Sequence, residues 1–318
     1  SMEQQDSIKP ESGQHYMHGT HKFRWTEKHW NFEQLDPLRH QYDELGSLVM
    51  GILETLARSQ GVQAHNRRRP DLFALLIQER ASDPVLARFW HEINTVPAWV
   101  DWAQLARGQR FFYRYVATTI MGFALQGFIG QNATTASVAE LLSRTGGFST
   151  RALSRRLLER FQLLLQVTGF SKPVEVDLGP GGITAHETAI RVRLRHASVQ
   201  SRILEIAEQR EGYFDMGQHG IPINTLNSIH AIATFCCNHI WLQLPQQGVK
   251  PRQQEAEDYI ALWRYVGYLL AVPTDAYFSG FEQAKTTMES TAGFRFSVPM
   301  SRSETKESGA ADSTQEYD

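Results

Sequence analysis

Apolar residues recur every three to four positions along most of the chain, separated by short polar breaks, and strand-like alternation is nearly absent. This period is typical of amphipathic helices. Prolines stand near most of the breaks, where helices begin or have just ended. The pattern predicts helices over residues 40–59, 70–79, 84–94, 101–107, 109–128, 135–144, 149–168, 186–210, 223–244 and 252–271.

The two ends of the chain lack this periodicity. Residues 1–24 and 297–318 are polar and poor in apolar side chains, so we expect both segments to be mobile tails. Between them no stretch is rich enough in Gly, Pro or Ser to divide the chain. The sequence therefore predicts an all-α fold, with one large helical domain over residues 25–296.

Composition narrows the range of functions. The 318 residues are 42% hydrophobic and 21% charged, with a net charge of −2, which is ordinary for a globular protein and gives no general nucleic-acid footprint. The two cysteines, Cys236 and Cys237, are adjacent and do not have the spacing of a zinc site. The longest apolar run, residues 115–130, contains Gln126 and is shorter than the roughly 20 residues that span a bilayer. We read this run as a buried helix.

Common catalytic motifs are absent. The stretch "DLGPGGIT" lacks the Gly-Lys-Ser/Thr of a phosphate loop, and the chain has neither the Gly-x-Ser-x-Gly of a serine hydrolase nor a His-Glu-x-x-His zinc pair. A di-iron bundle would need Glu-x-x-His, which neither Glu205 nor Glu208 begins. The three histidines of "HYMHGTH" lie in the expected N-terminal tail.

One histidine stands out within a predicted helix. In "RVRLRHASVQ", His196 shares a stripe with Val192, Val199 and other apolar residues, so helical spacing turns it inward and leaves Arg191 and Arg195 toward solvent. A buried imidazole without a partner costs roughly 1–3 kcal/mol. Its partner could be a backbone carbonyl, a carboxylate or a metal. A haem needs one such imidazole with apolar walls and arginines for its propionates, but spacing alone does not separate a haem ligand from a structural histidine.

Several longer stretches carry a resemblance. "RVRLRHASVQSRIL", "GIPINTLNSIHAIATF" and "EDYIALWRYVGYLLAVP" occur in the order typical of the rubber oxygenase (latex clearing protein) family, which also contains the fungal oxygenase of mycophenolic acid biosynthesis. "FRWTEKHWNFEQLDPLRHQYDELG" and "VPAWVDWAQLARGQRFFYRY" resemble the opening of its fungal members. The similarity covers about residues 23–280.

This resemblance implies a globin-like helical core that holds one b-type haem, with His196 as the proximal iron ligand. The family uses dioxygen, and its best-known members cleave an isoprenoid carbon–carbon double bond. On the distal side the family's arginine is matched by Arg156 in "RLLER", and a proposed glutamate base by Glu140 in "SVAELLSRTGG". The rubber-cleaving enzymes have Lys and Thr after their arginine, where this chain has Glu159 and Arg160.

Two further arginines are candidate propionate partners. Arg193 lies one turn before His196, and Arg264 lies off the core stripe of its helix, to which Trp263 belongs. The family's basic residue four positions after the proximal histidine is Gln200 here.

The resulting hypothesis is a haem b-dependent oxygenase that uses dioxygen on an apolar terpenoid or prenylated metabolite and cleaves a double bond. The alternatives are hydroxylation, dehydrogenation or cyclisation of such a substrate, or haem or gas binding without catalysis. We expect the protein in the cytoplasm or at the periphery of the endoplasmic reticulum. Membrane association is compatible with this sequence but is not encoded in it.

Overall fold

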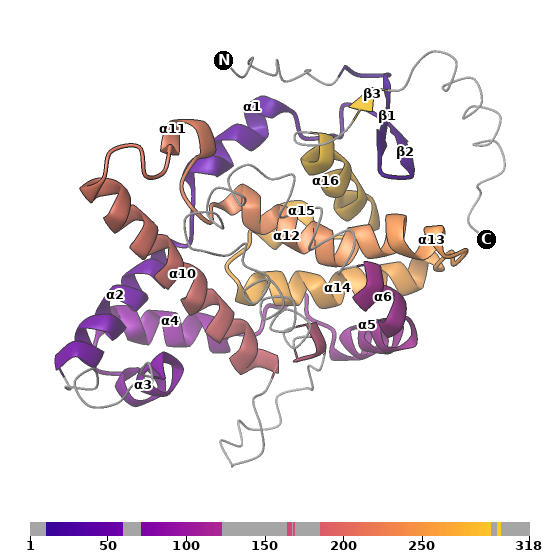
Figure 1. The fold of residues 1–318 in the computed structure, drawn as a ribbon. Coiled ribbons are helices and arrows are strands. Elements are labelled where there is room, and N and C mark those ends of the chain that lie inside the picture. Colours follow the sequence, from indigo (N-terminus) through magenta and orange to yellow (C-terminus); the bar gives the residue numbers. More distant parts are fainter. Residues whose placement is uncertain are drawn as a thin grey trace.

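The computed structural model describes residues 11–59, 71–122, 164–166, 168, 185–293 and 298–299. Helices dominate these residues, as the hydrophobic pattern predicts (Figure 1). The longer ones are α2 (Glu44–Ser59), α3 (Leu72–Glu79), α4 (Pro84–Asn94), α5 (Trp102–Arg114), α6 (Val116–Gly122), α10 (Ala185–Gln209), α12 (Thr225–Asn238), α14 (Gln253–Leu269) and α16 (Phe281–Gly293). Short turns of helix are α1 (Phe32–Leu35), η1 (Asp36–His40), α11 (Met216–His219), η3 (His239–Gln243), α13 (Leu244–Gln246) and α15 (Thr274–Tyr277).

Polar side chains fix where several helices begin. Asp71, Asp83 and Asp101 accept hydrogen bonds from backbone N–H groups in the first turns of α3, α4 and α5, and Asn224 does the same for α12. These bonds satisfy amides that have no partner within the helix. The helices therefore start within two residues of their predicted positions.

The helices pack around α14. One side of α14 contacts α5, another contacts α12, and α12 in turn packs against α16, while α10 lies beside α2 and α3 (Figure 1). The contact between α5 and α14 is close at Gly108, where an added Cβ would lie 2.3 Å from the carbonyl oxygen of Asp258. Arg107 reinforces this crossing with two hydrogen bonds to the Asp258 carboxylate, of 2.8 and 3.0 Å.

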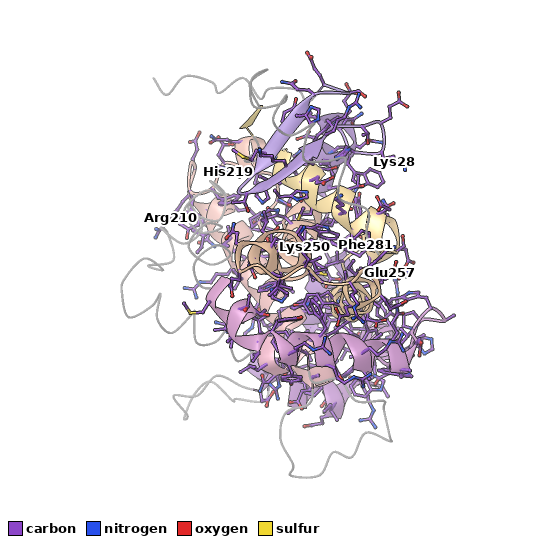
Figure 2. All side chains as sticks on the ribbon, turned by 90° about the vertical axis from the view of Figure 1, so that its right-hand side faces the viewer. Lys28, Arg210, His219, Lys250, Glu257 and Phe281 are labelled. Atoms are coloured by element: carbon purple, nitrogen blue, oxygen red, sulfur yellow. The ribbon has the colours of Figure 1, made fainter. Side chains whose placement is uncertain are left out.

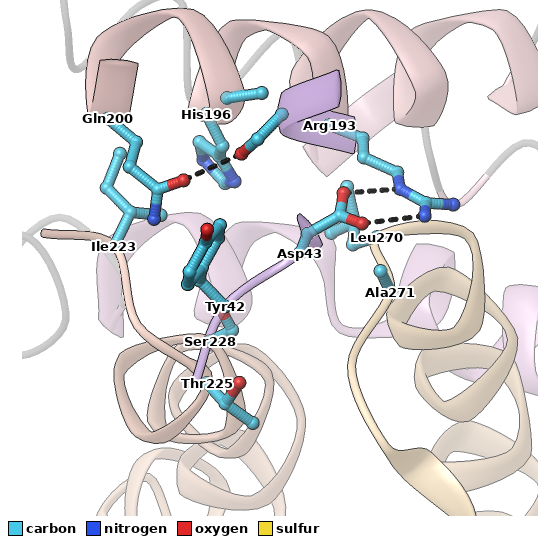
Figure 3. A pocket seen from close by; sticks show the side chains of 12 residues that line it. Tyr42, Asp43, Arg193, His196, Gln200, Ile223, Thr225, Ser228, Leu270 and Ala271 are labelled. Carbon is cyan, nitrogen blue, oxygen red and sulfur yellow. Dashed lines mark hydrogen bonds and ion pairs between the residues drawn. The ribbon is translucent and has the colours of Figure 1, made fainter. Parts of the chain in front are cut away.

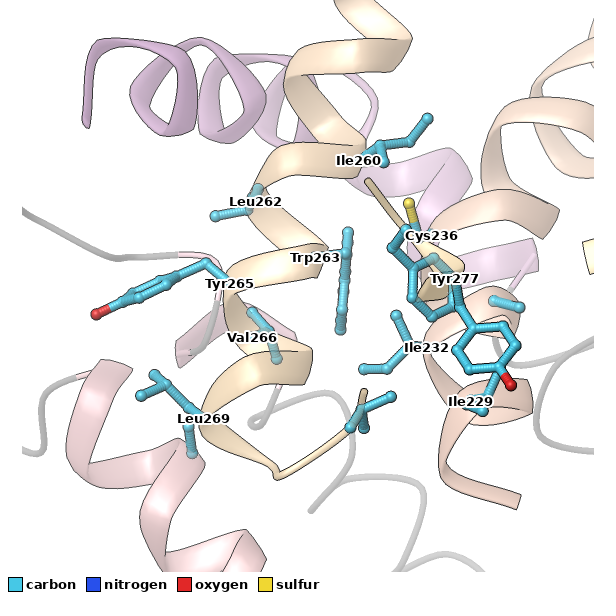
Figure 4. Close-up of a cluster of buried hydrophobic side chains, with 14 of the residues drawn as sticks. Ile229, Ile232, Cys236, Ile260, Leu262, Trp263, Tyr265, Val266, Leu269 and Tyr277 are labelled. Carbon is cyan, nitrogen blue, oxygen red and sulfur yellow. The ribbon is translucent and has the colours of Figure 1, made fainter. Parts of the chain in front are cut away.

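The main core cluster includes residues from most of the described helices, and Figure 4 shows its part around α12 and α14. Trp263 stacks on Phe235 with ring centroids 5.2 Å apart and an angle of 6° between the rings. Trp263 is buried, which agrees with its position on the core stripe of α14. The same cluster contains aliphatic side chains and one thiol of α12 and α14: Ile229, Ile232, Cys236, Leu262, Val266 and Leu269.

The N-terminal region departs from the prediction. Residues 1–24 are expected from the sequence to be a mobile tail, but β1 (His15–His18) and β2 (His21–Arg24) form an antiparallel hairpin there. The short strand β3 (Val298–Pro299), from the other end of the chain, pairs with β1. The expectation is wrong there because Tyr16, Phe23 and Trp25 build a small core of their own. The low apolar content of this segment gave no indication that Tyr16 and Phe23 would pack with Trp25, which directly follows it.

The hairpin is fastened to α16 by a carboxylate (Figure 2 shows the two side by side). His21 Nε2 donates to one oxygen of Glu289 at 2.8 Å, and His29 Nε2 donates to the other at 2.9 Å. Burial alone would raise the pKa of Glu289, but the hydrogen bonds from both histidines lower it below its usual value. The sequence pattern did not predict α16, because this helix buries Thr, Ser and Glu as well as apolar residues.

The predicted helix over residues 109–128 is divided where it is described. The helix α5 ends at Arg114, and α6 runs from Val116 to Gly122. None of the helices in the described ranges combines the length and the apolar character needed to cross a bilayer.

Beside α6, α12 continues into the π-helical turn η3, which begins with the fully buried His239. Its Nδ1 donates to Oε1 of Gln243 at 3.2 Å, and its Nε2 lies 2.9 Å from the hydroxyl oxygen of Thr119. Burial lowers the pKa of His239 to about 4, and the hydrogen bond with Gln243 offsets this only in part. His239 is therefore a neutral core histidine at neutral pH.

We expect His239 to make the fold sensitive to acid. Above its ordinary pKa of 6.5 the imidazole is neutral in both the folded and the unfolded chain, whereas between pH 6.5 and about 4 only the unfolded chain takes up the proton. The free energy of unfolding should fall by on the order of 3 kcal/mol across this range because of this one group. Urea unfolding at several pH values should show a shallower pH slope for His239→Gln. The exposed His91, changed to Gln, is the control, and an equal slope in parent and His239→Gln would contradict the prediction.

Candidate functional site

The structure places His196 differently from the prediction. His196 is exposed, whereas Arg193, Ala197 and Gln200 on the same helix are buried. The prediction that His196 faces the interior is therefore wrong. The buried face of α10 includes Arg193, Ala197 and Gln200 instead. An amphipathic pattern assigns arginine and glutamine to solvent, but here both polar heads are bonded inside the protein, so the buried face includes them.

His196 lines a cavity of about 30 Å³ between four parts of the chain (Figure 3). Its walls come from α10, from the start of α2 and the two residues before it, from the beginning of α12 and the segment that leads into it, and from the two residues that follow α14. The residues around it are Tyr42, Asp43, Ser47, Arg193, His196, Ala197, Gln200, Ile223, Thr225, Ser228, Leu270 and Ala271.

Arg193 forms a buried ion cluster at this cavity. Its Nε and one terminal nitrogen donate to the two oxygens of Asp43 at 2.7 and 2.9 Å, and its other terminal nitrogen lies 2.8 Å from Glu92. The guanidinium carbon lies 4.7 Å from the ring centre of Phe89. Burial would lower the pKa of Arg193, but the two carboxylates raise it above its ordinary value, so the group stays charged.

Gln200 forms a second buried connection, one turn beyond His196. Its Oε1 accepts from the hydroxyl of Ser47 at 2.8 Å, and its Nε2 donates to the carbonyl oxygen of Pro222 at 2.7 Å. Both ends of the amide are therefore bonded, one to α2 and one to the segment before α12.

Two residues of the cavity wall have unusual backbone conformations. Ile223 has a φ of 55° and Ala271 a φ of 59°. These are the two non-glycine residues with positive φ in the described part of the chain. The left-handed region is rarely adopted by a β-branched residue such as Ile223, and such strain costs on the order of 1–3 kcal/mol. Residues held in this way cluster at functional sites.

The predicted propionate partners already bind carboxylates of the protein. Arg193 binds Asp43 and Glu92, as described above. Arg264 lies 2.6 Å from a carboxylate oxygen of Asp275, and its guanidinium carbon lies 3.9 Å from the ring centre of Trp99. The Nε and both terminal nitrogens of Arg193 already contact the carboxylates of Asp43 and Glu92. These contacts therefore do not support the expectation that Arg193 binds a haem propionate. Arg264 is not among the described residues that line the His196 cavity.

The two distal candidates, Arg156 and Glu140, lie outside the described residues. The structure therefore gives no geometry for them relative to His196. Within the described ranges, no group of three or more His, Cys, Asp or Glu side chains has the arrangement of a metal site.

The residues at the cavity fit one part of a haem site. Haem iron can be held by a single imidazole, and His196 is an exposed imidazole at the rim of the cavity. The cavity volume of about 30 Å³ has room for about one or two water molecules and not for a porphyrin. The described residues thus include a candidate iron ligand, and the two predicted propionate partners bind carboxylates of the protein.

The sequence prediction missed Asp43, Ser47 and Ile223 as residues of this site. A signal for Asp43 was present, since it stands directly before α2 and accepts from the backbone N–H of Gly46, which is the position of a helix cap. Ile223 had no such signal, because only the backbone of the folded chain shows its positive φ.

Comparison with known proteins gives two matches. The family model described as "ER-bound oxygenase mpaB/B'/Rubber oxygenase, catalytic domain" matches residues 113–300, more than half of the chain. The solved structure titled "Structure of Latex Clearing Protein LCP in the closed state" is similar to this chain with a TM-score of 0.58 and 17% sequence identity. No curated protein matches the chain.

The structural match bears on the fold alone, because the sequence identity is low. It covers 80% of this chain and 64% of the latex clearing protein chain. The chain therefore spans less than two thirds of the length of the structure it resembles, and the all-α fold is the property the two share.

Proposed function

The chain belongs to the family of ER-bound oxygenases mpaB/B′ and rubber oxygenases, matched over the catalytic domain, and we propose that it is a haem b-dependent oxygenase in which His196 is the iron ligand. The observation that carries this proposal is the position of His196. Its exposed imidazole stands at the rim of a cavity whose walls include two strained residues.

In this proposal the roles of the protein and the cofactor are distinct. When bound, a haem held by one neutral imidazole supplies the site for dioxygen, and the surrounding pocket decides between carriage and activation. His196 binds the iron. Arg156, by resemblance to the family, would place a positive charge where negative charge develops on the reacting oxygen atoms, and Glu140 would take a proton from an allylic carbon of the substrate.

The proposed substrate is an apolar terpenoid or prenylated metabolite, and the proposed reaction is cleavage of a carbon–carbon double bond. In that reaction one molecule of dioxygen supplies both carbonyl oxygens. The family description supports an oxygenase; the substrate class follows from the resemblance of the motifs. We also propose that the protein acts in the cytoplasm or at the periphery of the endoplasmic reticulum.

An absorption spectrum of the purified protein reconstituted with haem tests the first step. A Soret band with one haem per chain is expected, and the absence of haem uptake would overturn the proposal. Turnover of a terpenoid under ¹⁸O₂ tests the second step. Two labelled carbonyl ends support cleavage, one labelled hydroxyl indicates hydroxylation, and a product without label indicates dehydrogenation or cyclisation.

Arg156→Ala should retain haem and its Soret band but lose turnover by about a hundredfold or more, because one well-placed donor in a water-poor pocket contributes roughly 3–4 kcal/mol to the stabilisation of developing charge. The measurement is turnover per bound haem under saturating dioxygen. The exposed Arg110 of α5, changed to Ala, is the control. Unchanged turnover in Arg156→Ala would assign the distal role to another residue.

A further inference from the structure

We propose that Arg193 and Gln200 are positioning residues, which hold the turn of α10 that carries His196 in place before a cofactor arrives. The inference rests on the proposed function, in which His196 binds iron. It assigns Arg193 a different role from the propionate contact that the sequence predicts.

The two residues bracket His196 along the helix. Arg193 lies three positions before it and Gln200 four positions after it, so each is about one helical turn away. Both are buried, with 3% of their surface exposed, whereas His196 is exposed. The two buried polar side chains are thus the neighbours, on the same helix, of the imidazole that would bind the haem iron.

Both anchors end at the start of α2, on Asp43 directly before the helix and on Ser47 in its first turn. Arg193 binds Asp43, whose carboxylate also accepts from the backbone N–H of Gly46, and Gln200 accepts from Ser47. A rotation of α10 about its axis, or a slide along it, would break both connections at once. The bidentate geometry of the Arg193 pair adds directional restraint to its charge.

Gln200 also restrains the opposite wall of the cavity. It donates to the carbonyl oxygen of Pro222, directly before Ile223 with its φ of 55°. On either side of Ile223, the N–H groups of Ile221 and Thr225 donate to the carbonyl oxygens of Arg39 and Gln41, both at 2.8 Å. A strained residue persists only where its surroundings hold it. These three bonds give Ile223 such surroundings.

The consequence for ligand binding is preorganisation. A metal ligand held by a well-bonded second layer keeps its orientation, and loss of such partners typically reduces metal affinity by about 10–100-fold. A merely structural role for the same residues would lower stability without changing the imidazole. The two readings therefore differ in what happens to His196 itself.

The test compares full-length variants with substitutions in α10. Two of them remove contacts beside His196, and one removes a similar set of contacts away from the His196 cavity. Gln200→Met removes one anchor, and the combined Arg193→Met/Asp43→Asn removes the other without leaving Asp43 charged. Arg191→Met is the matched control. Arg191 also binds two carboxylates, Asp71 and Glu187, and lies over a phenyl ring, that of Phe73, but it is not among the residues lining the His196 cavity.

The first measurement uses protein without haem, with ¹⁵N-labelled histidine and the His196 signals assigned by their loss in His196→Ala. We expect one narrow set of His196 imidazole signals in the parent and in Arg191→Met, and shifted or broadened signals in both anchor variants. The second measurement is haem transfer to an acceptor globin, which should be about tenfold or more faster for the anchor variants. The iron–histidine stretching band should also shift in these variants.

Unchanged His196 signals in folded Gln200→Met would overturn the proposal, as would equal changes in Arg191→Met. If the combined variant does not fold, Gln200→Met decides the matter alone. Failure of the proposed function is a separate result: the parent would take up no haem, or His196→Ala would retain it. The signals in the haem-free protein decide the positioning role in either case.

Discussion

His196→Ala is expected to abolish stoichiometric haem binding and to leave the helical content of the protein unchanged. Removing the imidazole removes the proposed protein bond to iron. The fold should tolerate the change, because His196 is exposed and substitutions at such positions usually alter stability by about 0.5 kcal/mol or less. The measurements are the ratio of haem to protein and the circular dichroism spectrum.

Tyr42 provides the control for this experiment. It lines the same cavity, and a tyrosine can also bind haem iron. Tyr42→Phe should keep full haem occupancy and the parent spectrum. His196→Gly should recover a haem spectrum when free imidazole is added, because the small molecule can enter the space left by the side chain. Full occupancy with an unchanged spectrum in His196→Ala would show that the iron ligand is another residue.

The sequence predicted helices well where polar caps and apolar spacing agree. The starts of α3, α4, α5 and α12 follow Asp71, Asp83, Asp101 and Asn224, residues whose side chains bond the first free amides. These signals are local, so they can be read without the rest of the protein. The family resemblance, carried by longer ordered stretches, agrees with the match of the family model over residues 113–300.

The face of α10 could not be predicted in the same way. Arg193 and Gln200 are buried because Asp43, Glu92, Ser47 and the carbonyl of Pro222 meet them from other parts of the chain. A pattern that counts hydrophobic positions along one helix contains none of these partners. The hydrophobic pattern of α16 is equally uninformative about Glu289. This buried carboxylate is hydrogen-bonded by two histidines that lie more than 250 positions earlier in the chain.

The cavity shows why a site is harder to predict than a fold. His196 was identified from its sequence neighbours, but its surroundings come from α2, the segment before α12 and the end of α14. Arg193 has the charge expected of a propionate partner, and only the distances to Asp43 and Glu92 show that this charge is already paired. Residue type indicated a possible chemistry, while the tertiary contacts determined which group the arginine binds.

Arg193→Ala should be strongly destabilising. The guanidinium is 3% exposed and pairs with Asp43 and Glu92, whose side chains are 23% and 38% exposed. Removing one partner of a buried ion pair costs about 3–5 kcal/mol, because the remaining charge is left without compensation. We expect the lower end of this range, since water can reach both carboxylates in part. The loss of contact with Phe89 adds to the effect.

Comparison with Arg191→Ala separates the effect of burial on stability from the effect of the number of ion pairs. Arg191 also pairs with two carboxylates, but it is 33% exposed and its partner Asp71 is 49% exposed, so its loss should cost about 1 kcal/mol or less. Urea unfolding of both variants without haem measures the difference directly. The combined Arg193→Met/Asp43→Asn should be more stable than Arg193→Ala, because it removes charge from both sides of the pair and keeps an apolar side chain beside Phe89. Equal losses for Arg193→Ala and Arg191→Ala would mean that the Arg193 cluster is solvated in solution, and the positioning role would then lose its physical basis.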